Sequence, residues 1–117
     1  MQEAVGVVGV ALQIGAPLEF EIIDQQGNVE HLVESAQRPR ELIAGLRNEI
    51  RRPEVERLSC GAYEIVAGEL FGNLFTVSGR PGGVLGIFED AERAACLFLV
   101  YVGLAAYVTQ VQNRERF

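Results

Sequence analysis

The sequence predicts an α+β domain, with a mainly antiparallel sheet of five to six strands, a middle helix and a long apolar C-terminal helix. Three observations favour this class: short β-branched or alternating segments separated by turn residues, one helix with prolines at both ends, and an uncharged stretch near the end of the sequence. With 117 residues, 49% hydrophobic and 22% charged, the composition is that of one globular domain spanning 1–117.

The first half begins with a predicted three-stranded region. Ala4–Ile14 is expected to be a strand, with a helix as the alternative, because valine favours strands and glycine disfavours helix interiors. Leu18–Asp24 alternates apolar and acidic residues, as a half-buried strand does, and leads into the turn Asp24–Asn28. Val29–Glu34 is predicted to return as the second strand of this hairpin, although the apolar spacing in 29–36 also fits a helix.

The middle helix is predicted over Pro39–Arg52, because proline suits a first helical turn and Pro53 cannot continue the helix. Its apolar residues share one face, Leu42, Ile43, Leu46 and Ile50. Its basic residues form a separate stripe, which is the predicted partner-binding site, Arg40, Arg47 and Arg51.

Three strand candidates follow this helix. Glu54–Gly68 is predicted as one long strand interrupted at Cys60-Gly61 by a bulge or bend. Asn73–Ser78 and Val84–Phe88 are the other two, joined by a glycine-rich turn. Glu89-Asp90 then opens the C-terminal helix, where the helix dipole favours acidic residues.

The C-terminal helix contains the uncharged stretch Ala94–Val108, whose 15 residues fall short of the roughly 20 that a membrane-spanning helix needs. A helix that is apolar all round is buried in protein or in lipid. We expect protein to cover it, either in the monomer or in an interface, with lipid as the remaining alternative.

The residues for catalysis and metal binding are few. His31 is the only histidine, the serines Ser35, Ser59 and Ser78 lack a nucleophile-elbow motif, and the two cysteines, Cys60 and Cys96, match no metal or redox spacing. The glycine-rich segments fit no phosphate-binding loop, and the sequence has no lysine. We therefore expect that the protein is not an enzyme and that it binds neither a cofactor nor a metal ion.

Charge limits the partners. A net charge of −6 argues against a general nucleic-acid binder. Residues 1–37 hold six acids and no arginine, whereas residues 38–57 hold six arginines against four acids. This distribution predicts an acidic sheet face and a basic helix face. The two faces could simply keep the protein in solution, or they could allow two copies, or this chain and an acidic partner, to dock through complementary charges. The start Met1-Gln2-Glu3 is unlike a signal peptide, so we expect a cytoplasmic protein.

The order of elements and several local segments resemble the roadblock family of dynein light-chain-like domains. The segments are the D-x-x-G turn Asp24–Gly27, the helix Pro39–Arg52, and the strands within Glu64–Glu69, Asn73–Val77 and Val84–Asp90. The predicted N-terminal strand departs from the helix with which family members usually begin. The resemblance implies a homodimer joined through a sheet edge and the middle helices, and a non-enzymatic regulator or scaffold for small GTPases or motor assemblies. The alternative is a small acidic chaperone or adaptor that binds an apolar segment of a partner protein.

Overall fold

The computed structural model describes residues 6, 9, 18–34, 38–68 and 74–115, and it confirms the α+β class. Within these residues the elements are β1 (Leu18–Asp24), β2 (Val29–Glu34), α2 (Pro39–Ile50), β3 (Val55–Cys60), β4 (Tyr63–Gly68), β5 (Leu74–Gly79), β6 (Gly83–Phe88) and α3 (Ala91–Glu115). The hairpin of β1 and β2 and the middle helix are therefore where the sequence predicts them.

The first predicted strand, Ala4–Ile14, lies outside the described residues except for Gly6 and Gly9. Both of these glycines have helical backbone, so the strand prediction is wrong at these two positions. Glycine and valine propensities are weak constraints that tertiary context overrides.

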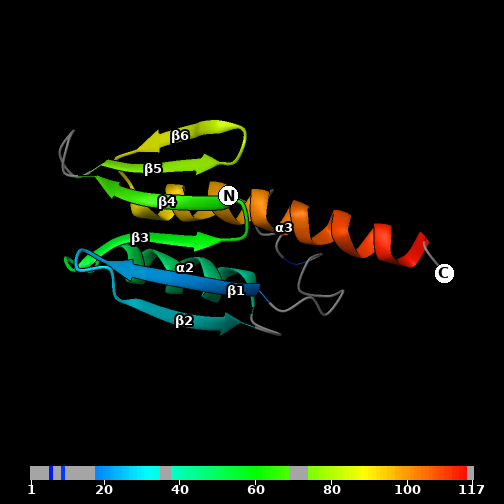
Figure 1. Ribbon diagram of the computed structural model, residues 1–117, viewed down its shortest axis with the longest axis horizontal. Helices are drawn as coiled ribbons and strands as arrows, with labels where there is room; N and C mark the ends of the chain where they lie inside the picture. The colour runs from blue at the N-terminus through cyan, green and yellow to red at the C-terminus, as the bar shows by residue number, and fades with distance from the viewer. Residues whose placement is uncertain (1–5, 7–8, 10–17, 35–37, 69–73, 116–117) are drawn as a thin grey trace.

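The six strands form one antiparallel sheet in the order β2-β1-β3-β4-β5-β6. Both α2 and α3 lie on the same side of it, behind the sheet in Figure 1. We call the side that they cover the covered face and the other side the open face. Because side chains alternate along a strand, every strand contributes to both faces.

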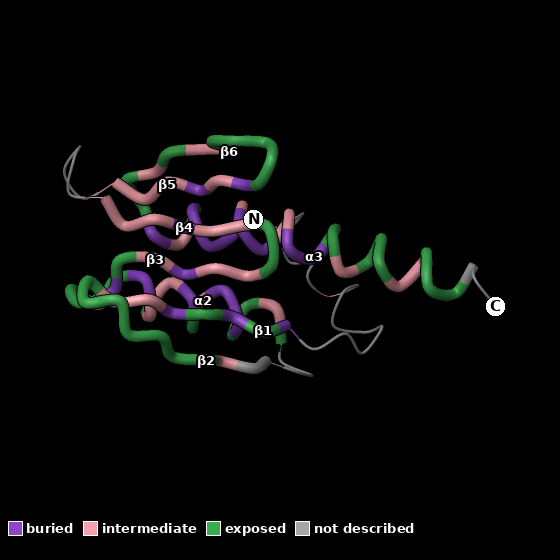
Figure 2. Tube along the Cα trace, in the orientation of Figure 1, coloured by how far each residue is buried: buried purple, intermediate pink, exposed green. Residues whose placement is uncertain are grey.

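The core fills the space between the covered face and the two helices. From the strands it takes side chains such as Phe20, Leu58 and Ile65, none of which is exposed. From α2 it takes the four apolar residues predicted from the sequence, Leu42, Ile43, Leu46 and Ile50. The rings of Phe20 and Phe98 lie 6.1 Å apart and join β1 to α3. The buried parts of the trace accordingly lie where helices and central strands overlap (Figure 2).

The turn between β1 and β2 is built around the Asp24 carboxylate. This carboxylate accepts hydrogen bonds from the backbone N–H groups of Gln26 (2.9 Å) and Asn28 (2.8 Å), and from the Asn28 side-chain amide (2.9 Å). The hydrogen bonds from Asn28 are the main cause of a lowered pKa at Asp24. Gly27 supplies the positive φ of 85° that the reversal requires.

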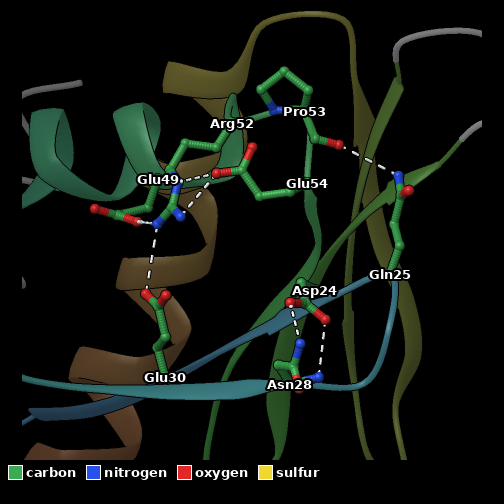
Figure 3. Close-up of polar contacts among 8 residues, drawn as sticks. All are labelled: Asp24, Gln25, Asn28, Glu30, Glu49, Arg52, Pro53 and Glu54. Carbon is green, nitrogen blue, oxygen red and sulfur yellow. Dashed lines mark hydrogen bonds and ion pairs between the residues drawn. The ribbon is translucent and has the colours of Figure 1, made fainter.

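A single arginine ties the end of α2 to two strands. The guanidinium of Arg52 contacts Glu49 on α2 (2.8 Å), Glu54 before β3 (2.8 Å) and Glu30 on β2 (3.5 Å), as Figure 3 shows. The hydrogen bonds to Glu49 and Glu54 raise the pKa of Arg52. Beside this cluster, the Gln25 side-chain amide donates to the Pro53 carbonyl oxygen at 3.3 Å. The tip of the β1–β2 hairpin is thus held against the segment that leaves α2.

The prediction of one long strand over Glu54–Gly68 is wrong. The chain reverses after Cys60, and β3 and β4 form a hairpin in which Cys60 pairs with Tyr63. Gly61 has a φ of 59°, a conformation that glycine adopts without steric cost, and this permits the tight turn. A bend and a reversal both need a permissive residue, so the dipeptide Cys60-Gly61 did not distinguish them.

The C-terminal helix α3 begins where Asp90 caps it, with the Asp90 carboxylate accepting from the Glu92 N–H at 2.9 Å. It packs closely on β6, because a Cβ at Gly86 would lie only 3.0 Å from the Leu97 side chain of α3. Its residues are mostly buried as far as Gly103, and beyond that point the helix extends past the end of the sheet (Figure 1).

The expected burial of Ala94–Val108 therefore holds only for its first part. Phe98 and Leu99 are fully buried, whereas Leu104, Tyr107 and Val108 are 45%, 43% and 48% exposed. By length and composition Ala91–Arg114 of α3 could cross a membrane, but in this fold its first half packs against the sheet and beside α2.

We expect Phe98→Ala to lower the free energy of unfolding by ~3–5 kcal/mol, because it leaves a cavity where α3 meets the sheet. Phe98→Leu, which leaves less empty volume, should lose clearly less. Urea denaturation followed by circular dichroism would measure both variants. A loss below about 1 kcal/mol for Phe98→Ala would contradict this account of the core.

Asp24 should stabilise the fold in a pH-dependent way. Because its pKa is lowered in the folded state, its contribution is present above the pKa of an unfolded aspartate, about 4, and is lost as pH falls further. Thermal melts should show Asp24→Asn less stable than the parent at pH 7, with the gap closing towards pH 2. Glu56→Gln removes an exposed carboxylate without a described hydrogen bond, so its melting temperature should differ from that of the parent by a small amount that does not change with pH. A constant gap for Asp24→Asn would contradict the role of its carboxylate.

Candidate interaction surfaces

The described residues do not assemble a catalytic constellation around His31. This histidine is exposed on the open face and pairs in register with Glu21, which in turn pairs with Ser59. Glu21 therefore separates the imidazole from the nearest serine of that row. Ser35 lies outside the described residues, and no group of three or more metal-ligating side chains occurs among the described ones.

Cys60 is poorly suited to act as a nucleophile. Burial, with a further contribution from the nearby charge of Glu19, raises the pKa of its thiol to about 11. The thiolate, which is the reactive form, is therefore scarce at neutral pH. Cys96 is buried in α3, and burial raises the pKa of its thiol as well.

The predicted arginine stripe on α2 divides into two kinds of residue. Arg47 is half-buried, and its guanidinium lies 3.3 Å from the Glu92 carboxylate of α3. Arg40 and Arg51 are exposed near opposite ends of α2, and neither has an ion pair within the described part of the chain. The Arg47–Glu92 pair links the two helices, and partly exposed pairs of this kind contribute about 0.2–1 kcal/mol. Only Arg40 and Arg51 remain available to a partner.

The second surface is the half of α3 that extends beyond the sheet, Leu104–Glu115, which we call the projecting half. Its apolar residues continue a stripe that begins under the sheet with 4-3-4-3 spacing, Leu97, Tyr101, Leu104, Val108 and Val111. In the covered part of this stripe, Leu97 packs beside Gly86 of β6 and the Tyr101 ring lies 5.5 Å from the Tyr63 ring of β4. The C-terminal part of α3, where Leu104 and Val108 of the stripe are exposed, extends past the end of the sheet (Figure 1).

The third surface is the open face, where the register places two rows of side chains across all six strands. We call the first the apolar row, and its members are Val29, Ile23, Arg57, Val66, Thr76 and Ile87. We call the second the polar row, and its members are His31, Glu21, Ser59, Glu64, Ser78 and Val84.

The two rows are linked by a few polar contacts. Arg57 of the apolar row leans towards Glu64 of the polar row, with 3.7 Å between guanidinium and carboxylate. The Ser78 hydroxyl donates a long hydrogen bond of 3.5 Å to the same carboxylate. A shallow cavity of about 240 Å³ lies here, bordered by Arg57, Glu64 and Arg80 among others. Glu19 and Glu21 on β1 have no ion-pair partner within the described ranges.

Sequence reasoning found the arginine stripe but missed these two rows. The alternation of Leu18–Asp24 already indicates that Glu19 and Glu21 share a face. Which residues of the other strands lie beside them depends on register, and a single strand carries no information about its partner's register.

A scan against protein-family models found no match for this chain, and searches of curated proteins and of solved structures found none either.

The raised pKa of Cys60 predicts slow alkylation. At pH 7.5, iodoacetamide should modify Cys60 about a hundredfold more slowly than a short cysteine peptide, and the rate should keep rising above pH 9. Mass spectrometry of a Cys96→Ala variant would follow this one thiol, and the urea-unfolded protein supplies the control for ordinary reactivity. Modification of the folded protein at the peptide rate would contradict the buried thiol.

Proposed function

We propose that this chain is a non-enzymatic protein-binding module that works as a homodimer. The observation that carries the proposal is the apolar stripe of the projecting half of α3, which continues beyond the sheet the half-buried side of the helix where Leu97 and Tyr101 contact β6 and β4. Leu104 and Val108 are 45% and 48% exposed there, and Val111 follows at the same spacing. Residues repeated at four and three positions along a helix form a continuous seam that a second helix can cover.

A second copy offers such a seam by symmetry, because in a twofold interface each subunit presents the same surface to the other. Covering exposed leucine and valine side chains would stabilise the pair through the hydrophobic effect. The resemblance to roadblock proteins supports a dimer as well, and it supports the narrower proposal that the dimer is a cytoplasmic regulator or scaffold for a small GTPase. In that proposal Arg40 and Arg51 supply the cations that meet the acidic groups of the partner.

A second candidate function is the small acidic adaptor, which covers an apolar segment of another protein. The apolar row on the open face favours it, because Val29 and Ile87 are 48% and 58% exposed there. The two candidates differ in the state of the purified protein: the adaptor is a monomer until its partner is present, whereas the regulator is a dimer on its own.

Sedimentation equilibrium in detergent-free buffer tests the dimer. We expect a mass of twice 12.8 kDa at micromolar concentration, and the double variant Leu104→Ser/Val108→Ser should raise the dissociation constant at least about tenfold. The thermal stability of the monomer should change little, because both side chains are exposed.

Asn113→Ser is the matched control, since Asn113 is exposed on the same helix but lies on the side away from the stripe. The proposal would be contradicted if the parent protein stayed monomeric at about 100 µM. It would also be contradicted if the double variant dimerised with the same dissociation constant as the parent. A chain that stays in solution only with detergent would instead favour a membrane role for α3.

A further inference from the structure

We infer that the open face of the sheet is a docking site for a basic amphipathic helix of a partner protein, with the apolar row and the unpaired glutamates of β1 as its two contact zones. This inference rests on the proposed protein-binding function and names the chemistry of the partner. It uses a surface on the side of the sheet opposite the helices, so it does not depend on dimerisation through α3 (Figure 1).

The apolar row is continuous, since each member pairs in register with the next from β2 to β6. The solvated face of an antiparallel sheet usually carries polar side chains. Here the row consists of Val, Ile, Arg, Val, Thr and Ile, and only Arg57 interrupts its apolar side chains with a charge. The Arg57 guanidinium is drawn aside towards Glu64, which leaves the row itself apolar.

The dimensions of the row suit a helix. Six strands at about 4.8 Å spacing span about 24 Å, which is the length of a helix of about 16 residues. Successive turns of a helix place side chains about 5.4 Å apart, close to the distance between neighbouring strands. An amphipathic helix lying across the strands can therefore set one apolar side chain over each strand of the row.

Charge indicates which amphipathic helix fits. Glu19 and Glu21 project from β1 on the same face, and neither is paired with a cation in the described residues. A helix with its apolar side on the row and lysine or arginine along its flank would pair with these carboxylates.

The same charges disfavour a second copy of this chain at this site. Two open faces packed together would bring the Glu19–Glu21 pairs of both subunits into one interface, where like charges repel. A basic helix is complementary in both its apolar and its charged side, so it is the occupant that these observations select.

The test uses a synthetic 18-residue peptide with leucine on one helical side and lysine on the other. Titration into ¹⁵N-labelled protein should move the backbone amide resonances of Ile23, Val66, Thr76 and Ile87. Resonance shifts confined to Leu104–Val111 would mean that the peptide uses the α3 stripe, and would overturn the inference. A titration to 200 µM peptide detects complexes with dissociation constants up to about 1 mM. The absence of any resonance shift at that concentration would overturn the inference too.

Variants separate specific docking from general charge attraction. Fluorescence anisotropy should show Ile87→Asp weakening the peptide at least about tenfold and Glu21→Arg at least about fivefold. Glu41→Arg makes the same charge change at an exposed site on α2 and should alter the affinity less than about twofold. An equal loss in Glu41→Arg and Glu21→Arg would overturn the inference.

Circular dichroism would confirm that Ile87→Asp stays folded, and Val84→Asp, at another exposed site of β6 outside the apolar row, is its matched control. Sedimentation of the same variants keeps the two proposals distinct. If the protein is a monomer that binds the peptide, the docking site is supported and the dimer is contradicted. If it is a dimer that does not bind the peptide, the dimer is supported and the docking site is contradicted.

Discussion

Coverage of the sheet on one face alone is the constraint from which the rest of this structure follows. Among the described elements, two helices have to bury the inward side chains of six strands, and both lie on the same side (Figures 1 and 2). The contact of Phe98 with Phe20 places α3 over the first strand of the chain, and the packing of Leu97 beside Gly86 places it over the last. The C-terminal helix therefore packs on β4, β5 and β6 and reaches β1 through Phe98, while α2 lies beside it and packs on β3.

This arrangement has two consequences for function. The C-terminal helix extends past the end of the sheet, so the stripe that begins with the half-buried Leu97 and Tyr101 continues into solvent at Leu104 and Val108. The sheet itself has a second face that no described helix covers, and register gathers Ile23, Val66 and Ile87 into one row there. Both surfaces are apolar positions left after the internal core is complete. Contiguous exposed apolar surfaces mark protein–protein or membrane interaction sites or ligand-binding grooves.

The sequence predicted the elements whose signals are local. The prolines around α2, the alternation of β1 and the turn at Asp24 each arise within a few residues, and the structure confirms them. The prediction from the sequence was wrong at Cys60-Gly61. A permissive glycine allows a bend as well as a reversal, and only the pairing with the partner strand decides between them. Of the predicted interface, Arg40 and Arg51 remain exposed, while Arg47 is held by Glu92, a residue far away in the sequence.

Composition and periodicity by themselves therefore determined the class of fold, the antiparallel hairpin, the apolar face of α2 and the acidic outer side of β1. Only the tertiary structure decided which part of the apolar stretch of α3 is covered, which side chains from six strands stand in one row, and which arginines of the α2 stripe have no ion pair among the described residues. The physical reason is that periodicity is a property of one segment, whereas coverage, register and ion pairing are properties of two segments brought together. Leu97 and Leu104 are the same residue type two turns apart on one side of α3, yet Leu97 packs beside Gly86 of β6, whereas Leu104, in the part of the helix that extends past the sheet, is 45% exposed.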